Sequence, residues 1–204
     1  NILVAAVCDV EKACIPSFIE IIESGAFDSC RNLPKVEFPE DSKIQRIEKF
    51  AFGFSGIKKI SFPVHLTYIG SDSFSFCSNL NYVDFPENSE IQIIGDNAFN
   101  GSNIEKLFIP DKLQKICQRA FFACFQLRSV KFSENSELQS IEKEAFASTL
   151  IKSFCIPRHV KSIGTGAFFK CFGLQIIEID ENSELQDFDR KLIIDNENTI
   201  IMIP

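Results

Sequence analysis

The stretch CIPRHVKSIGTGAFFKCFGLQIIEI, residues 155–179, decides the fold, because its features recur along the chain. Its Ala167-Phe168 pair belongs to a series of phenylalanines at alternating intervals of 25 and 22 residues. The series comprises Phe27, Phe52, Phe74, Phe99, Phe121, Phe146 and Phe168. Prolines repeat every 47 residues, at Pro16, Pro63, Pro110, Pro157 and Pro204. A fixed period over 204 residues predicts a repeat protein whose full period is one long unit and one short unit.

Each unit contains a short segment with alternating apolar residues, such as LRSVKF at 127–132, which predicts a β-strand. Proline or a Pro-Glu-Asn-Ser type loop follows and ends the strand. Nine strands are expected, near residues 10–15, 33–38, 57–62, 80–85, 104–109, 127–132, 151–156, 174–179 and 198–203. An apolar pair comes next, as at Val160 and Ile163, and then often Gly with Ser, Asp or Thr. These polar residues are good N-caps, so a single helical turn carrying Ala-Phe is expected there.

One strand of this length cannot bury its own apolar face, but stacked units form a continuous core. We therefore expect a mainly β solenoid, with a parallel sheet on the concave face and short turns or single helical turns on the convex side. Stacking explains why the chain has 22 Phe but only 2 Tyr and no Trp: the repeated phenylalanines form ladders in the core. The register runs through both ends, with Ala5 and Ile193 at the phenylalanine position, so residues 1–204 are expected to be one domain.

The composition of the chain argues against some classes of binding partner. The formal net charge of −7 and the sequence pI near 5.0 disfavour nucleic acid and anionic membranes as partners. No apolar stretch approaches the roughly 20 residues of a membrane span. The chain begins at Asn1 and its final strand ends on apolar residues without a polar cap, so we expect a fragment of a longer chain, or end-to-end self-association.

The motif of residues 155–179 resembles the BspA-like class of leucine-rich repeats found in bacterial and protozoan surface proteins. The alternation with segments such as FPENSEIQII, residues 85–94, is similar to the trichomonad branch of these surface antigens. The resemblance covers almost the whole chain and implies a right-handed leucine-rich-repeat solenoid at the cell surface or secreted, with a role in adhesion or host-protein binding. It brings no catalytic residues with it.

The cysteines do not form a metal motif, because no C-x-x-C pair is present. Five of the eight occupy the third position after the repeated phenylalanine: Cys8, Cys30, Cys77, Cys124 and Cys171. Ser or Thr takes that position in alternate units. Cysteines two coils apart are too distant for a disulfide, and only Cys8 and Cys30 lie in adjacent coils. Mainly free thiols are expected, and whether these two form a disulfide stays open.

Catalytic chemistry has no pattern to support it. His65 and His159, the only histidines, lie four coils apart in corresponding loops, and no triad or phosphate loop is present. The recurring acidic ENSE loops at 87–90, 134–137 and 181–184 suggest calcium, but solvated turns explain them better. We expect no enzyme activity, no cofactor and no metal.

Three functions remain: a recognition module of a surface protein that binds a host or matrix protein or a glycan, an intracellular scaffold, and a structural spacer. The first is preferred, and its binding face is expected on the outward row of the strand sheet. Most residues of this row are charged or small, and Tyr82, Phe108 and Ile176 interrupt the pattern. Exposed aromatics beside charges are typical of binding hot spots. The candidate contact residues are Lys35, Glu37, Lys59, Tyr82, Asp84, Lys106, Phe108, Lys131, Ile176 and Glu178.

Overall fold

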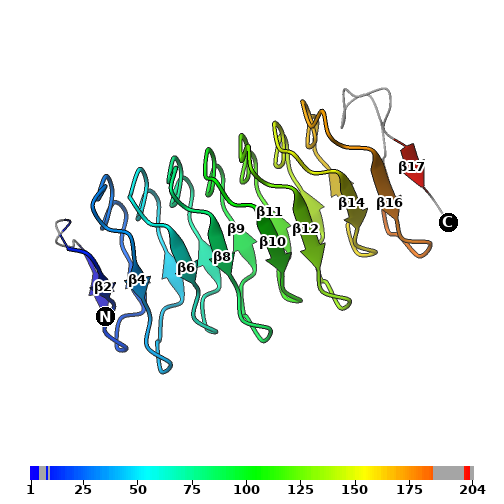
Figure 1. Ribbon diagram of the computed structural model, residues 1–204. Helices are drawn as coiled ribbons and strands as arrows, with labels where there is room; N and C mark the ends of the chain where they lie inside the picture. The colour runs from blue at the N-terminus through cyan, green and yellow to red at the C-terminus, as the bar shows by residue number, and fades with distance from the viewer. Residues whose placement is uncertain (5–7, 9, 186–199, 203–204) are drawn as a thin grey trace.

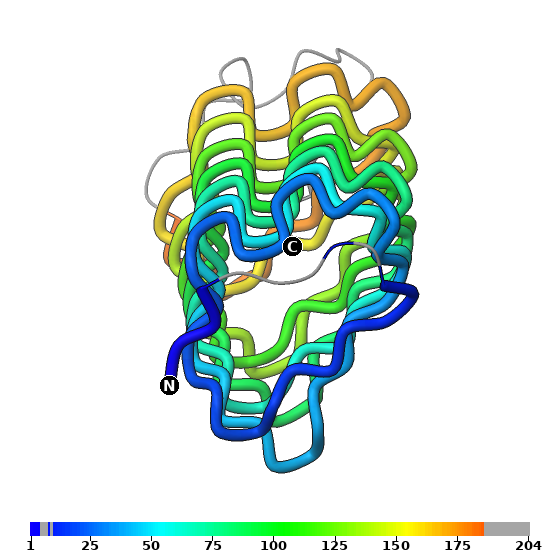
Figure 2. The backbone as a smooth tube through the Cα atoms, turned by 90° about the vertical axis from the view of Figure 1, so that its left-hand side faces the viewer, coloured from blue at the N-terminus to red at the C-terminus, as the bar shows by residue number. Residues whose placement is uncertain are grey.

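The structure is a computed structural model that describes residues 1–4, 8, 10–185 and 200–202. These residues form a parallel β-solenoid in which each coil stacks on the one before it (Figure 1). Viewed at 90° to this direction, successive coils follow nearly the same outline (Figure 2). The predicted leucine-rich-repeat solenoid is confirmed. Ala5 and Ile193, assigned above to the phenylalanine position, lie outside the described residues.

One row of strands carries the expected alternation, and all nine predicted strands are present. They are β2 (Ala13–Cys14), β4 (Val36–Glu37), β6 (Lys59–Ser61), β8 (Tyr82–Asp84), β10 (Lys106–Ile109), β12 (Ser129–Phe132), β14 (Ser153–Ile156), β16 (Ile176–Ile179) and β17 (Ile200–Met202). Parallel ladders join these strands in separate groups, β2–β4, β6–β8, β10–β12 and β14–β16–β17. We call this row the paired-strand face.

A second row of short strands was not predicted. It consists of β1 (Ile2–Leu3), β3 (Ile21–Ile22), β5 (Arg46–Ile47), β7 (Tyr68–Ile69), β9 (Ile93–Ile94), β11 (Lys115–Ile116), β13 (Ser140–Ile141) and β15 (Ser162–Ile163). These form one continuous eight-stranded parallel sheet. The expectation of one strand per unit is therefore wrong. A two-residue strand gives too short a segment for alternation to be visible in the sequence.

The core between the two rows is built on the repeated phenylalanines, as predicted. All seven are essentially buried, from Phe27 to Phe168. Neighbouring rings stack with centroids 4.7 Å apart for Phe27 and Phe52 and 5.3 Å apart for Phe99 and Phe121. Offset stacking of this kind adds to the stabilisation from burial, so the ladder ties consecutive coils together.

The Ala-Phe segment is a series of turns, and the described residues contain no helix. Positive φ angles recur at two positions in each coil, two residues before and two after the phenylalanine, as at Asn97 and Gly101 around Phe99. Left-handed residues interrupt a helix, so the turn alternative is correct and the helical one is wrong. Consistently, the Asp96 side chain accepts a hydrogen bond from Gln118 N of the next coil, 3.1 Å away. It does not cap its own turn.

The cysteine register is also explained by stacking. Cys77, Cys124 and Cys171 each lie beside Ser55, Ser102 or Thr149 of the preceding coil, at 3.3, 3.4 and 3.2 Å. Cys8 and Cys30 form a disulfide across adjacent coils, with Cα atoms 4.7 Å apart, and the other six cysteines form no disulfide. The expectation of mainly free thiols is confirmed, and the open question on the first pair is answered. Within the described part of the chain, no helix has the length and apolar character to cross a membrane.

Candidate functional site

The candidate contact residues all lie on the paired-strand face, with the alternation expected of a half-buried sheet. In β8 the central Val83 is buried and its neighbours Tyr82 and Asp84 are exposed. In β10, Lys106 and Phe108 are exposed while Leu107 and Ile109 are buried. Tyr82 is 49% exposed and Phe108 43%.

The remaining candidates differ in exposure. Lys35, Lys59, Lys131 and Glu178 are exposed, whereas Glu37 and Ile176 are half-buried. Ile176 is therefore less exposed than Tyr82 and Phe108, the other two apolar candidates.

Charged side chains organise the N-terminal part of this face. Glu37 accepts ion pairs from Lys12 and Lys35, each at 2.5 Å. Hydrogen bonds from these two ammonium groups lower the pKa of the Glu37 carboxyl to about 2. Next along the face, Lys59 lies opposite Tyr82 in the β6–β8 register, with its Nζ 6.0 Å from the ring centroid. The ammonium is thus within reach of a weak cation–π contact.

A cavity of about 750 Å³ opens beside these groups. It spans β4 and β6, which are joined by a single bridge between Lys35 and Lys59 and by no regular ladder. Its walls bring together four of the predicted residues, Lys35, Glu37, Lys59 and Tyr82. A volume of this size falls in the range of ligand pockets.

A smaller cavity of about 350 Å³ lies between β12 and β14, again where two ladders meet, and Lys131 lines it. The five other candidates, Asp84, Lys106, Phe108, Ile176 and Glu178, line neither cavity. Sequence reasoning missed Glu11, Asn32 and Lys58 of the larger cavity. Glu11 and Lys58 lie inside the predicted strand segments 10–15 and 57–62 but not at their outward positions, and Asn32 precedes the segment 33–38.

The two histidines lie beside carboxylates of the acidic loops. His65 Nδ1 lies 3.2 Å from Glu90, and His159 Nδ1 lies 2.7 Å from Glu184, in each case 25 residues further on. The bond from His159 lowers the pKa of the Glu184 carboxyl. Carboxylates of two acidic loops are therefore engaged with neighbouring coils.

Repeat length, strand pattern and phenylalanine ladder define a class of protein, the leucine-rich-repeat solenoids. The family model of the BspA type leucine rich repeat region matches residues 5–93 and 92–192 with six copies. The chain belongs to this family. A comparison with curated proteins gives no match.

Solved structures agree on the fold. A leucine-rich repeat protein from Bacteroides ovatus is 19% identical with a TM-score of 0.62, and the match covers 94% of this chain and 62% of that one. The T. pallidum leucine rich repeat protein is 26% identical with a TM-score of 0.60, covering 80% of this chain and 64% of that one. A leucine rich cell surface protein from Faecalibacterium prausnitzii is 23% identical with a TM-score of 0.51, covering 93% and 70%. The chain thus spans less than two thirds of the length of the first two.

Proposed function

We propose that this solenoid is a non-catalytic recognition module of a cell-surface or secreted protein, and that it binds a protein partner, of a host cell or its matrix, through the paired-strand face. The observation that carries the proposal is the 750 Å³ cavity with the exposed Tyr82 in its wall. Tyrosine is enriched at hot spots, where a rigid aromatic ring enters the partner and charged neighbours surround it. Phe108, exposed on the next coil, extends the apolar contact along the face.

Several features support the surface location. Leucine-rich-repeat domains serve protein–protein interaction in general, and one relative of the same fold is described as a cell surface protein. The Cys8–Cys30 disulfide is of a kind that persists in oxidising compartments outside the cell. This observation favours the surface module over the intracellular scaffold.

The experiment has two stages. The purified chain is first used to capture partners from host-cell and matrix extracts, with and without enzymatic removal of glycans. Binding of the captured partner is then measured for Tyr82→Ala with Phe108→Ala. The double variant should lose about 2 kcal/mol of binding free energy, or roughly 30-fold in affinity, without a large change in melting temperature.

Phe125→Ala is the matched control, because Phe125 is 60% exposed and lies in a turn outside the paired-strand face. This variant should bind as the wild type does. An unchanged affinity in the double variant would place the binding site elsewhere, and a loss of binding after glycan removal would make the ligand a glycan.

A further inference from the structure

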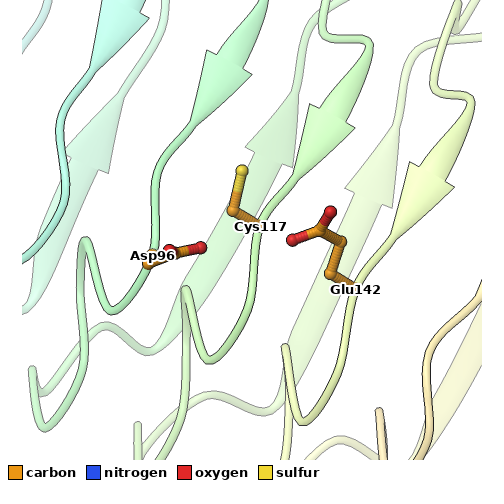
Figure 3. Close-up of side chains that lie close together, drawn as sticks. All are labelled: Asp96, Cys117 and Glu142. Carbon is orange, nitrogen blue, oxygen red and sulfur yellow. The ribbon is translucent and has the colours of Figure 1, made fainter.

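Three chemically reactive side chains converge on the other row of strands, away from the proposed binding face. Asp96, Cys117 and Glu142 come from three consecutive coils, just after β9, β11 and β13 (Figure 3). One carboxylate oxygen of each acid and the Sγ atom of Cys117 all lie within 4.8 Å of one another. Figure 3 shows Cys117 between the two carboxylates, which extend toward its coil from either side.

The strand register produces this convergence. Ile94, Ile116 and Ile141 are aligned in the β9–β11–β13 ladder, and Cys117 and Glu142 directly follow the last two. Gly95 follows Ile94, so Asp96 is the first residue after β9 that carries a side chain. The amide of Gln118 then donates to both acids, to Asp96 Oδ1 and to Glu142 Oε2, each at 3.1 Å. This shared donor holds two like charges on opposite sides of one thiol.

The Cys117 thiol differs from the other buried thiols. It is only 9% exposed, and among the described residues no hydrogen-bonding partner is found for its sulfur. Cys77 and Cys124, by contrast, each donate to a phenylalanine carbonyl, at 3.0 and 3.2 Å. Cys117 also stands outside the register of those cysteines, which follow the repeated phenylalanine. A buried thiol without a hydrogen-bonding partner, lying within 4.8 Å of two carboxylates, is suited to a cation.

We propose that Asp96, Cys117 and Glu142 bind one thiophilic divalent cation of the zinc class. Zinc accepts thiolate and carboxylate ligands at about 2.3 and 2.0–2.2 Å in a tetrahedral arrangement, with water in the fourth position. Closing the three atoms to such distances needs a shift of about an ångström, which surface carboxylates can make by changing rotamer. Calcium does not fit, because it takes six to eight oxygen ligands and does not use sulfur.

The net charge of the site also favours a divalent cation. With a protonated thiol the two carboxylates carry −2, and Lys115, whose Nζ is 2.7 Å from Glu142 Oε1, offsets one unit. On binding, the S–H bond breaks, a sulfur–metal bond forms and the proton leaves to solvent, so three anionic ligands, Lys115 and the dication sum to zero. A cysteine thiol ordinarily carries its proton near neutral pH. One proton should therefore be released for each ion bound near neutral pH.

The bound ion would connect three coils. The connection lies on the continuous eight-stranded sheet, where each coil otherwise contributes only a two-residue strand. Binding to the folded state alone raises the melting temperature, so thermal stability gives a readout that is independent of spectroscopy.

The test uses the whole chain, with Cd²⁺ as a spectroscopic probe and Zn²⁺ in calorimetry. Cd²⁺ should give a sulfur-to-metal charge-transfer band at one equivalent, and Zn²⁺ should bind with the same stoichiometry and release one proton. Cys117→Ser should abolish the band. Asp96→Asn and Glu142→Gln should each weaken Zn²⁺ binding at least about tenfold, and Lys115→Gln, which removes the competing cation, should strengthen it.

Cys155→Ser is the matched control, because Cys155 is an exposed thiol with Glu178 and Asp180 nearby. It should bind like the wild type. The proposal is overturned if Cys117→Ser keeps the band, if the two acid variants bind Zn²⁺ unchanged, or if Cys155→Ser removes the site. Glu142→Gln replaces one carboxylate oxygen by an amide nitrogen. If the metal-free variant melts at the same temperature as the metal-free wild type, its weaker Zn²⁺ binding does not come from misfolding.

Discussion

Replacing Phe99 by alanine should cost about 4 kcal/mol of folding free energy. Phe99 is fully buried and stacks on Phe74 and Phe121, with ring centroids at 5.1 and 5.3 Å and interplanar angles of 6° and 3°. Burying its side chain contributes roughly 1.5–3 kcal/mol, and each lost stacked contact adds about 1 kcal/mol. The total falls within the range of about 3–5 kcal/mol found for Phe→Ala in protein cores.

Urea denaturation followed by circular dichroism measures this difference. Hydrogen exchange gives a second, local measurement, which matters because repeat arrays do not always unfold as one unit. Amides of the Phe99 coil should lose protection more than those of distant coils. Phe125→Ala is again the control: its ring is 60% exposed, so the same substitution should cost well under 1 kcal/mol. Equal losses in the two variants would refute the role given to the ladder.

Three other results are expected. Gly56→Ala should destabilise the fold by about 1–3 kcal/mol in the same urea assay, because a Cβ there would overlap the Arg31 carbonyl; a wild-type midpoint would contradict the tight contact between these coils. In an acid titration followed by NMR, Glu37 should titrate near pH 2; because its folded pKa is lowered from 4.5, its small stabilising effect is present above that value and is lost as pH falls toward 2. In native alkylation without reductant, the exposed thiols should react first and the buried ones only on unfolding, as burial raises the pKa of Cys77 and Cys124 to about 11 and 12; early labelling of Cys124 would contradict its placement in the stack.

The sequence predicts what the repeat imposes on every coil. Phe27 to Phe168 stand in register because each ring must pack on the next, and the exposed positions of β8 and β10 follow from alternation along the strand. The second sheet escapes prediction because its strands have two residues each, as in Ser140–Ile141. Their pairing depends on stacked neighbours and leaves no periodicity within the unit.

The two candidate sites, on the paired-strand face and at Cys117, also differ in how far the sequence could predict them. Tyr82 and Phe108 could be identified because they break a column of charged and small residues. The cavity beside Tyr82 could not, since it depends on where one ladder stops and the next begins. Asp96, Cys117 and Glu142 each lie in a different coil, more than 20 residues apart, and only a strand register accurate to one residue would bring them together.

The division of the paired-strand face into ladders of two has a consequence for how such a chain can change length. Within a pair, β10 and β12 are matched over four residues, whereas no regular ladder joins β8 to β10 or β12 to β14. A duplication or deletion of 47 residues cut at these boundaries leaves every ladder whole and keeps long and short units alternating. Gain or loss of a single unit would set two like units side by side and separate strands from their partners. The double coil is therefore the module by which genes of this architecture can lengthen or shorten their product without loss of folding.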